Sequence, residues 1–250
     1  MHISHEFSSQ NYDRRPMGSS IEFIVLHYTE MIFENAIAKL CDQAAKVSCH
    51  YLVKESGEIF QLVEDEMRAW HAGTSAWGGK VALNDYSIGI EIDNLGNHPF
   101  TEQQMVSCIE LCKFLVDKHK IKPWNIIGHS DIAPSRKLDP GLYFDWNRLA
   151  AANLGMFPKK YVELDSLEES PQITQAESVA LLQMNLAKLG YNVKPTGLFD
   201  AQTNCVIRAF QAHFCQANLL MRGMNLYRDL DSQYCWDAES QQKLDALLNK

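Results

Sequence analysis

The sequence has 250 residues, a length that suits one large domain or two modest ones. Hydrophobic residues make up 46% and charged residues 22%, which excludes a largely disordered chain. The net charge of −8, from 23 Lys+Arg against 31 Asp+Glu, disfavours a protein that binds nucleic acid or an anionic membrane through a basic surface.

Targeting signals and cysteines indicate in which cellular compartment a protein acts. No stretch approaches the about 18 consecutive apolar residues of a membrane span. The first 20 residues lack the apolar segment of a signal peptide, so we expect none in this sequence. The seven cysteines are an odd number in a chain too long to need disulfides, so we expect mainly reduced thiols.

The first elements alternate between strand and helix patterns. Residues 1–20 are polar and aperiodic, which indicates an arm. IEFIVLHYT (21–29) is β-branched and apolar, as in a strand buried on both faces. Residues 33–46 have helical spacing, and 49–63 predict a hairpin that turns at 55–58.

The next elements continue the alternation. In SIGIEID (87–93) the isoleucines share one face, and Gly89, Glu91 and Asp93 share the other. Thr101 is placed to cap a long amphipathic helix, and NIIGHSDI (125–132) predicts a short strand. Strands interleaved with helices indicate an α/β fold.

The amino-acid composition changes after residue 157. Residues 157–175 are charged and contain proline, which is typical of a linker. Helical patterns follow over 178–190, after an Asp200 N-cap, and over 237–248. The second part is therefore predicted to be a small all-α domain.

Two histidines stand at predicted strand ends, where α/β sheets open into ligand-binding crevices. His27 stands where the first buried strand ends, and His129 stands where a second short strand, NIIG, ends. Asp139, in the shaped turn LDPG, can direct a carboxylate at the same point. Two His and one Asp with one open position suit catalytic zinc. The alternative is two hydrogen-bonded core histidines and an aspartate that caps a turn.

Other histidines compete for such a site. His50 opens a strand and His71 lies in a Trp- and Gly-rich loop, so both are serious rivals as ligands. For the remaining five we expect no ligand role, with His213 on the exposed side of its helix: His2, His5, His98, His119 and His213.

Two charged residues suit amide chemistry beside such a metal. If its strand is central, Glu91 points into an apolar layer, where desolvation raises a carboxyl pKa and makes it a usable proton acceptor. Lys137 stands two residues before Asp139, so both project to the same side of an extended segment. A cation there stabilises an oxyanion. The alternatives are a salt-bridged glutamate and a solvated lysine.

Six segments in register resemble a known family. IVLHYT, SCHYLV, AWHAG, SIGIEI, GHSDIAPSRKLDPG and FDW, over about residues 11–150, are similar to the zinc-dependent N-acetylmuramoyl-L-alanine amidases of the type-2 amidase family, whose fold peptidoglycan recognition proteins share. LLQMNLAKLGY and GLFDAQTNCVIRAFQ resemble the small helical peptidoglycan-binding module. Residues 215–236 depart from that module's usual short connection.

The resemblance implies a domain plan and a set of roles. It implies a central mixed β-sheet flanked by helices in an amidase domain (1–157), a linker (158–175) and a helical peptidoglycan-binding-like domain (176–250). It also implies one Zn²⁺ per chain held by His27, His129 and Asp139, with Glu91 as catalytic acid/base and Lys137 as stabiliser of the transition state.

The expected reaction is hydrolysis of the amide between N-acetylmuramic acid and L-alanine, in peptidoglycan or muropeptides. Trp70 and Trp77 are candidates for stacking on sugars, His71 for bonding the peptide and Arg136 for meeting stem-peptide carboxylates. The family's role favours the cell envelope, and the missing signal peptide makes the cytoplasm the alternative. Sequence leaves the oligomeric state open.

Three other functions stay open at this stage. A recognition protein would bind peptidoglycan without cutting it. A cysteine peptidase would use a thiol such as Cys49, although Cys49 and the adjacent His50 point to opposite faces of a strand. A structural zinc is disfavoured, because no fourth ligand stands nearby in CxxC-like spacing.

Overall fold

A computed structural model describes residues 1–158, 176–223 and 235–249. Its strands are β1 (Ile3–Ser4), β2 (Tyr12–Arg14), β3 (Phe23–Tyr28), β4 (Tyr51–Val53), β5 (Ile59–Gln61), β6 (Met67–Ala69), β7 (Ala76–Trp77), β8 (Lys80–Val81), β9 (Ser87–Ile92) and β10 (Ile126–Gly128). Its α-helices are α1 (Phe33–Cys41), α2 (Glu102–His119), α3 (His129–Ile132), α4 (Trp146–Ala151), α5 (Ala176–Leu189), α6 (Ala201–Phe214), α7 (Gln216–Met221) and α8 (Ala238–Leu248).

The main sheet is mixed, as the family resemblance implies. Its six strands lie in the order β1-β5-β4-β9-β3-β10. Strand β3 runs parallel to β9 and β10, while β4 is parallel to β9 and antiparallel to β5. All six residues of β3 are buried, because the strand is central and both of its faces are covered. The predicted hairpin is confirmed as the β4–β5 pair.

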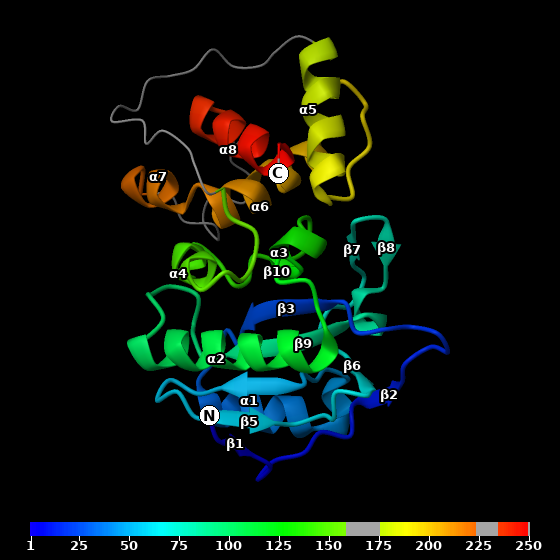
Figure 1. Cartoon of the computed structure of the whole chain (residues 1–250), viewed down its shortest axis with the longest axis vertical. Helices are drawn as coiled ribbons and strands as arrows, with labels where there is room; N and C mark the ends of the chain where they lie inside the picture. Colours follow the sequence, from blue (N-terminus) through cyan, green and yellow to red (C-terminus); the bar gives the residue numbers. More distant parts are fainter. Residues whose placement is uncertain (159–175, 224–234, 250) are drawn as a thin grey trace.

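Helices α1 and α2 cover opposite faces of this sheet. Successive strand residues point to opposite faces, and β4 shows the division. Leu52 belongs to a cluster with Phe33 and Leu40 of α1. Tyr51 and Val53 belong to the main core, which also holds the buried apolar residues of α2. Figure 1 shows α2 beside the sheet, with its axis running along the strands.

The ends of these helices follow from local capping. The predicted cap of α2 is confirmed: Thr101 Oγ1 accepts from the Gln104 amide at 3.1 Å, and Gln104 Oε1 accepts from the Thr101 amide at 3.0 Å. Helix α1 ends at Cys41, earlier than predicted. The Asp42 carboxylate accepts from the Ala44 amide and starts a 3₁₀ turn instead.

The strand predicted over 125–132 is too long. Strand β10 stops at Gly128, and His129 opens the short helix α3. The cause is Asp131, whose Oδ2 accepts from the Gly128 amide at 2.7 Å and so caps the helical turn. His129 is therefore the first residue of a helix and stands just beyond the sheet edge.

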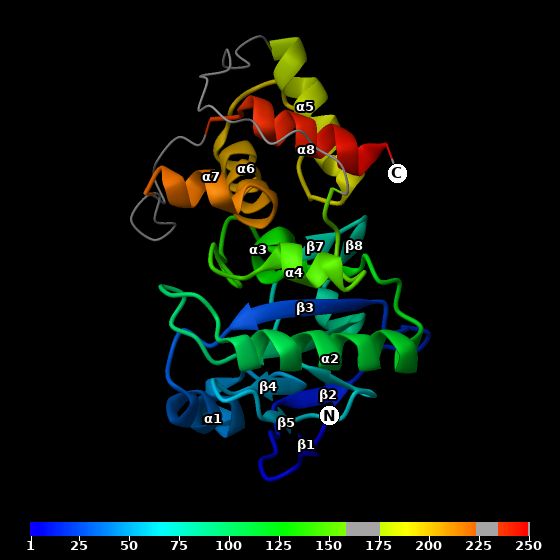
Figure 2. The same ribbon diagram turned by 60° about the vertical axis from the view of Figure 1, so that its left-hand side comes forward.

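Helices α5–α8, which we call the helical unit, lie on one side of the sheet with α3 and α4 between (Figures 1 and 2). The predicted Asp200 cap is confirmed, since its Oδ1 accepts from the Thr203 amide at 2.9 Å. The predicted linker 158–175 lies, apart from Pro158, outside the described residues. Over the three described ranges, no helix is both long and apolar enough to cross a bilayer.

The expectation for His213 is wrong. It is only 2% exposed, and its ring stacks on Trp146 of α4 with the ring centroids 3.7 Å apart. Its Nδ1 lies 2.8 Å from Asp131 Oδ2. The face of α6 that looks exposed by helical periodicity is covered by α3 and α4 of the sheet domain.

Candidate metal centre

Parallel strands bring the candidate residues to one edge of the sheet. His27 of β3 is the register partner of Glu91 of β9, and Glu91 is also paired with Leu52. The three side chains therefore share the face that α1 covers. Gly128, paired with Leu26, ends β10 at this edge, and His129 follows directly. Asp139 arrives from the loop after α3.

The two histidines and the aspartate form a tight triangle. His27 Nδ1 lies 2.9 Å from His129 Nδ1 and 2.9 Å from Asp139 Oδ2. His129 Nδ1 lies 3.0 Å from the same oxygen. All three residues are buried. In a tetrahedral zinc site, donor atoms stand about 3.3 Å apart, so this triangle has the size that zinc needs.

The outer ring nitrogens fix where the protons are. His129 Nε2 lies 3.1 Å from the carbonyl oxygen of Ala72, so it must carry the proton and donate. His27 Nε2 lies 3.0 Å from His71 Nδ1, and His71 Nε2 lies 3.2 Å from Ser87 Oγ. Ser87 Oγ in turn donates to the Leu83 carbonyl at 2.6 Å. We assign a one-way chain of donors that starts at His27 Nε2.

This assignment leaves three lone pairs facing one another. A neutral imidazole has one N–H, and both rings use theirs on the outer side. Nδ1 of His27, Nδ1 of His129 and the Asp139 carboxylate then meet at about hydrogen-bond distance with no proton between them. A bound cation resolves that repulsion, and the outer hydrogen bonds orient the rings as they do around catalytic zinc.

The protonation states agree with such a site. Burial and the neighbouring His129 lower the pKa of His27 to about 4, against the opposing effect of Asp139. Burial pushes the pKa of Asp139 up, but His129 and His27 outweigh it and hold that pKa well below its usual range. At neutral pH the pocket therefore presents a neutral imidazole and an ionised carboxylate, the forms that bind metal.

The rival histidines lie behind the triangle. His71 lines the pocket, but both of its ring nitrogens face His27 and Ser87, so they are not directed at a substrate. His50 Nδ1 accepts from the Gly89 amide at 2.9 Å and takes no part in the ligand triangle. The structure thus places His71 as a support for His27.

Gly89 leaves the space that His71 occupies. A Cβ at residue 89 would come within 2.3 Å of the His71 ring. We therefore expect Gly89→Ala to displace His71, to lower the free energy of unfolding by about 1–3 kcal/mol and to weaken metal binding about 10- to 100-fold. Thermal unfolding and zinc titration would measure both effects.

Glu91 stands beside the triangle as an unpaired carboxylate. Its Oε2 is buried without a hydrogen-bond partner in the described part of the chain. Burial raises the pKa of Glu91 well above its usual value, and the charge of Asp139 adds to this, while Lys137 and Lys39 oppose it. Glu91 is half-buried, and a carboxylate with a raised pKa and one free oxygen is a typical general base.

A pocket of about 420 Å³ opens over this group. His129, Asp139 and Glu91 lie in its wall together with Lys137. Exposed Arg136 also lines it and donates from Nη2 to the carbonyls of Ala72 and Thr74, both at 2.8 Å.

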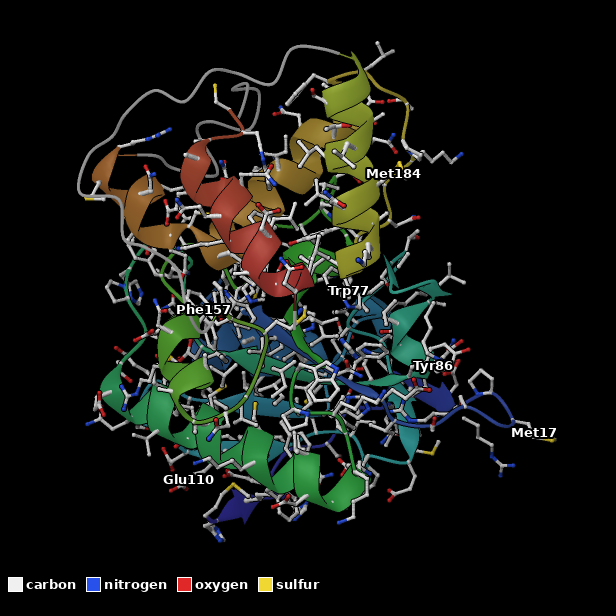
Figure 3. All side chains as sticks on the ribbon, turned by 45° about the horizontal axis from the view of Figure 1, so that its top comes forward. Met17, Trp77, Tyr86, Glu110, Phe157 and Met184 are labelled. Atoms are coloured by element: carbon white, nitrogen blue, oxygen red, sulfur yellow. The ribbon has the colours of Figure 1, made fainter. Side chains whose placement is uncertain are left out.

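The two tryptophans lie elsewhere. Trp77 is 5% exposed, and its ring packs edge-on against Tyr191 with the centroids 4.8 Å apart. Figure 3 shows Trp77 beneath the end of α5. Trp70 is half-buried and follows β6, which pairs with β2, and it is not among the residues that line the pocket. In this structure neither ring is presented to the pocket.

Among the residues of the pocket wall that sequence reasoning missed, one cation comes from the other domain. Arg208, on α6 of the helical unit, lines the pocket with the amidase-domain residues. Its position in a 14-residue amphipathic helix gave no signal, because nothing local predicts which face of α6 meets the other domain.

Comparisons with known proteins fit this site. The profile of the Amidase_2 family, described as N-acetylmuramoyl-L-alanine amidase, matches residues 17–142, and a peptidoglycan binding domain profile matches residues 175–217. N-acetylmuramoyl-L-alanine amidase AmiD of Escherichia coli is 40% identical over 210 residues, covering 78% of this chain and 75% of that protein. The 1,6-anhydro-N-acetylmuramyl-L-alanine amidase AmpD of Haemophilus influenzae is 35% identical over 162 residues, covering 57% and 88%.

A solved structure extends the likeness to the whole chain. The complex of AmiD from E. coli with the substrate anhydro-N-acetylmuramic acid-L-Ala-D-γ-Glu-L-Lys superposes with a TM-score of 0.76 at 35% identity. The match covers 94% of this chain and 92% of that one. The family resemblance read from the sequence motifs is confirmed, and the chain belongs to the Amidase_2 family of N-acetylmuramoyl-L-alanine amidases.

Proposed function

We propose that this protein hydrolyses the amide bond between N-acetylmuramic acid and L-alanine in peptidoglycan or muropeptides, with one zinc ion held by His27, His129 and Asp139. The observation that carries the proposal is the set of three converging lone pairs beside the free carboxylate of Glu91. A structural zinc site is closed by four protein ligands, whereas three ligands beside the Glu91 carboxylate are typical of a catalytic site with an open position.

The roles of the residues follow from their surroundings. Zinc, when bound, lowers the pKa of water and polarises the amide carbonyl. Glu91 takes the proton of the attacking water through its free Oε2 and passes it to the leaving amine of L-alanine, which a carboxylate of raised pKa does efficiently. Lys137, in the same wall, places a positive charge near the oxyanion.

Cations at the pocket suit an acidic substrate. Arg136 and Lys39 are exposed and line the pocket, so they give this net-acidic protein a local positive field. The substrate in the AmiD complex contains a γ-linked glutamate, whose α-carboxylate is free. Stem-peptide carboxylates of this kind are the proposed partners of Arg136. The proposed place of action is the cell envelope, with the cytoplasm as the alternative for soluble fragments.

Product analysis on defined muropeptides tests the proposal. Wild-type protein is expected to release stem peptide with a new free L-alanine amine, detected by mass spectrometry. A chelator should abolish that release, and added zinc should restore it, because the proposed reaction needs the metal ion that His27, His129 and Asp139 hold. The same chelator saturated with zinc is the control.

The same experiment distinguishes the amidase from a recognition protein that binds peptidoglycan without cutting it. Binding of muropeptide without any new amine, in protein shown by metal analysis to hold one zinc per chain, would identify a recognition protein. Substrates with and without the 1,6-anhydro end then show which form is preferred.

A further inference from the structure

The helical unit is fastened to the segment that carries the active site. Asp131, next to His129, accepts from the Tyr191 hydroxyl at 2.8 Å and pairs with His213. Gln216 Nε2 donates to the carbonyls of Leu142 and Phe144, at 2.9 and 2.7 Å. These bonds are buried or partly buried, so they fix α6 and α7 against the loops around the metal triangle.

This packing brings one cation from the helical unit into the pocket. Arg208 of α6 is 5% exposed and lines the same pocket as Glu91 and Asp139. Its Nη2 donates to the Pro134 carbonyl at 2.7 Å. Within the described ranges, no acceptor for its Nε or Nη1 is found. The other N–H groups of this guanidinium are therefore available to an anionic acceptor that enters the pocket.

The chemistry of the pocket indicates which anion. A guanidinium matches a carboxylate in two parallel hydrogen bonds, and Lys39, Arg136 and Lys137 add positive charge around it. Three carboxylates line the pocket, but Asp139 is turned to the two histidines, and within the described residues neither Glu30 nor Glu91 forms an ion pair with Arg208. Glu91 Oε2 bonds to nothing described. The substrate in the AmiD complex offers two free carboxylates, one on γ-linked glutamate and one at the peptide's end.

We propose that Arg208 binds a free carboxylate of the stem peptide, so that the helical unit selects the substrate at the catalytic pocket itself. This inference rests on the proposed amidase function. It makes Arg208 a specificity-determining residue, which is distinct from a structural role in which its bond to Pro134 only steadies the loop before Lys137.

Three tripeptide substrates test the assignment: the free acid, the same compound with the glutamate α-carboxylate amidated, and the same compound with the terminal carboxylate amidated. In the full-length zinc enzyme, Arg208→Gln is expected to raise KM for the free acid about 10- to 100-fold with kcat little changed. It should leave KM unchanged for the one amide that lacks the recognised carboxylate. Arg208→Lys, which keeps the charge, should recover part of the loss.

The control is Arg222→Gln, an arginine of the helical unit that is paired with Asp237 and stands outside the pocket lining. It should leave all three KM values at the wild-type level. If Arg208→Gln instead lowers kcat equally for all three substrates, or weakens zinc binding, Arg208 acts through Pro134 alone and the proposal is overturned while the amidase stands.

Calorimetric binding measurements test the role of Arg208 independently of the amidase activity. Binding of the three muropeptides to Glu91→Gln protein, with and without Arg208→Gln, reports recognition without turnover. Preferential binding of the free acid that disappears with Arg208→Gln supports the inference even if the wild type proves inactive. Equal binding of acid and amides by a folded Arg208-containing protein rejects it.

Discussion

Glu91→Gln is expected to lower kcat about 10²- to 10⁴-fold while zinc stays bound, because the amide nitrogen cannot accept the proton of the attacking water. The change keeps the shape of the side chain and leaves all three lone pairs of His27, His129 and Asp139 in place. Steady-state turnover of a muropeptide and metal analysis of the same sample measure the two quantities together.

Glu30→Gln is the matched control. Glu30 is an exposed carboxylate that also lines the pocket, so Glu30→Gln changes a neighbouring carboxylate to an amide and leaves Glu91 in place. We expect kcat of Glu30→Gln to stay within a few fold of wild type. Near-normal turnover by Glu91→Gln would show that another group moves the proton, and loss of zinc from it would show that Glu91 supports the metal instead.

The same substitution also gives a pH signature in the metal-free protein. The pKa of Glu91 is raised on folding, so the folded state holds this proton more tightly than the unfolded state does. That contribution to stability is fully present below the unfolded pKa of about 4.3 and is lost as pH rises through the folded pKa. Metal-free Glu91→Gln should therefore be more stable than metal-free wild type at neutral pH, and the difference should vanish in acid.

Much of the candidate site could be predicted from strand ends. A buried, β-branched run such as the one before His27 predicts a central strand. Its carboxyl end must then lie where the ends of the neighbouring parallel strands meet, which is where α/β sheets bind ligands. Alternation in SIGIEID likewise fixes the face of Glu91 once its strand is central. These are local properties of the chain, and the packing of the sheet then brings the residues together.

Contacts made across the fold could not be predicted in the same way. The period-2 pattern places Gly89 on the face of Glu91, but nothing local shows that His71 folds over it. The period of α6 separates an apolar stripe from a polar one, yet docking of the helical unit buries the polar stripe as well. His213 was therefore expected in solvent, and Arg208 was overlooked.

The structure also differs from the sequence-based expectation for Trp77. Trp77 lies in the Trp- and Gly-rich loop and was expected to stack on sugars. The structure buries it against Tyr191, and a Cβ at Gly190 would come within 2.4 Å of the Trp77 ring. A loop aromatic can equally well serve the packing between two domains, and the sequence of one domain does not show which.

Buried Asp131 joins the two domains, and its removal is expected to have the largest effect on stability. Its carboxylate accepts from the Gly128 amide, the Tyr191 hydroxyl and His213 Nδ1, and all of these groups are buried. Asp131→Ala leaves three donors without an acceptor. We expect it to lower the free energy of unfolding by about 3–5 kcal/mol. Urea or thermal unfolding of full-length protein measures the loss.

Graded variants show whether that loss comes from the contact between domains. Tyr191→Phe removes one donor and should cost about 1 kcal/mol, because only a single hydrogen bond is lost. In the double variant with Asp131→Ala, the Tyr191 hydroxyl has no partner left, so Tyr191→Phe should then cost almost nothing. Because α3 begins at His129, Asp131→Ala should also weaken zinc binding, whereas Tyr191→Phe should do so less. Additive costs in the double variant would mean that the two side chains do not act through one contact.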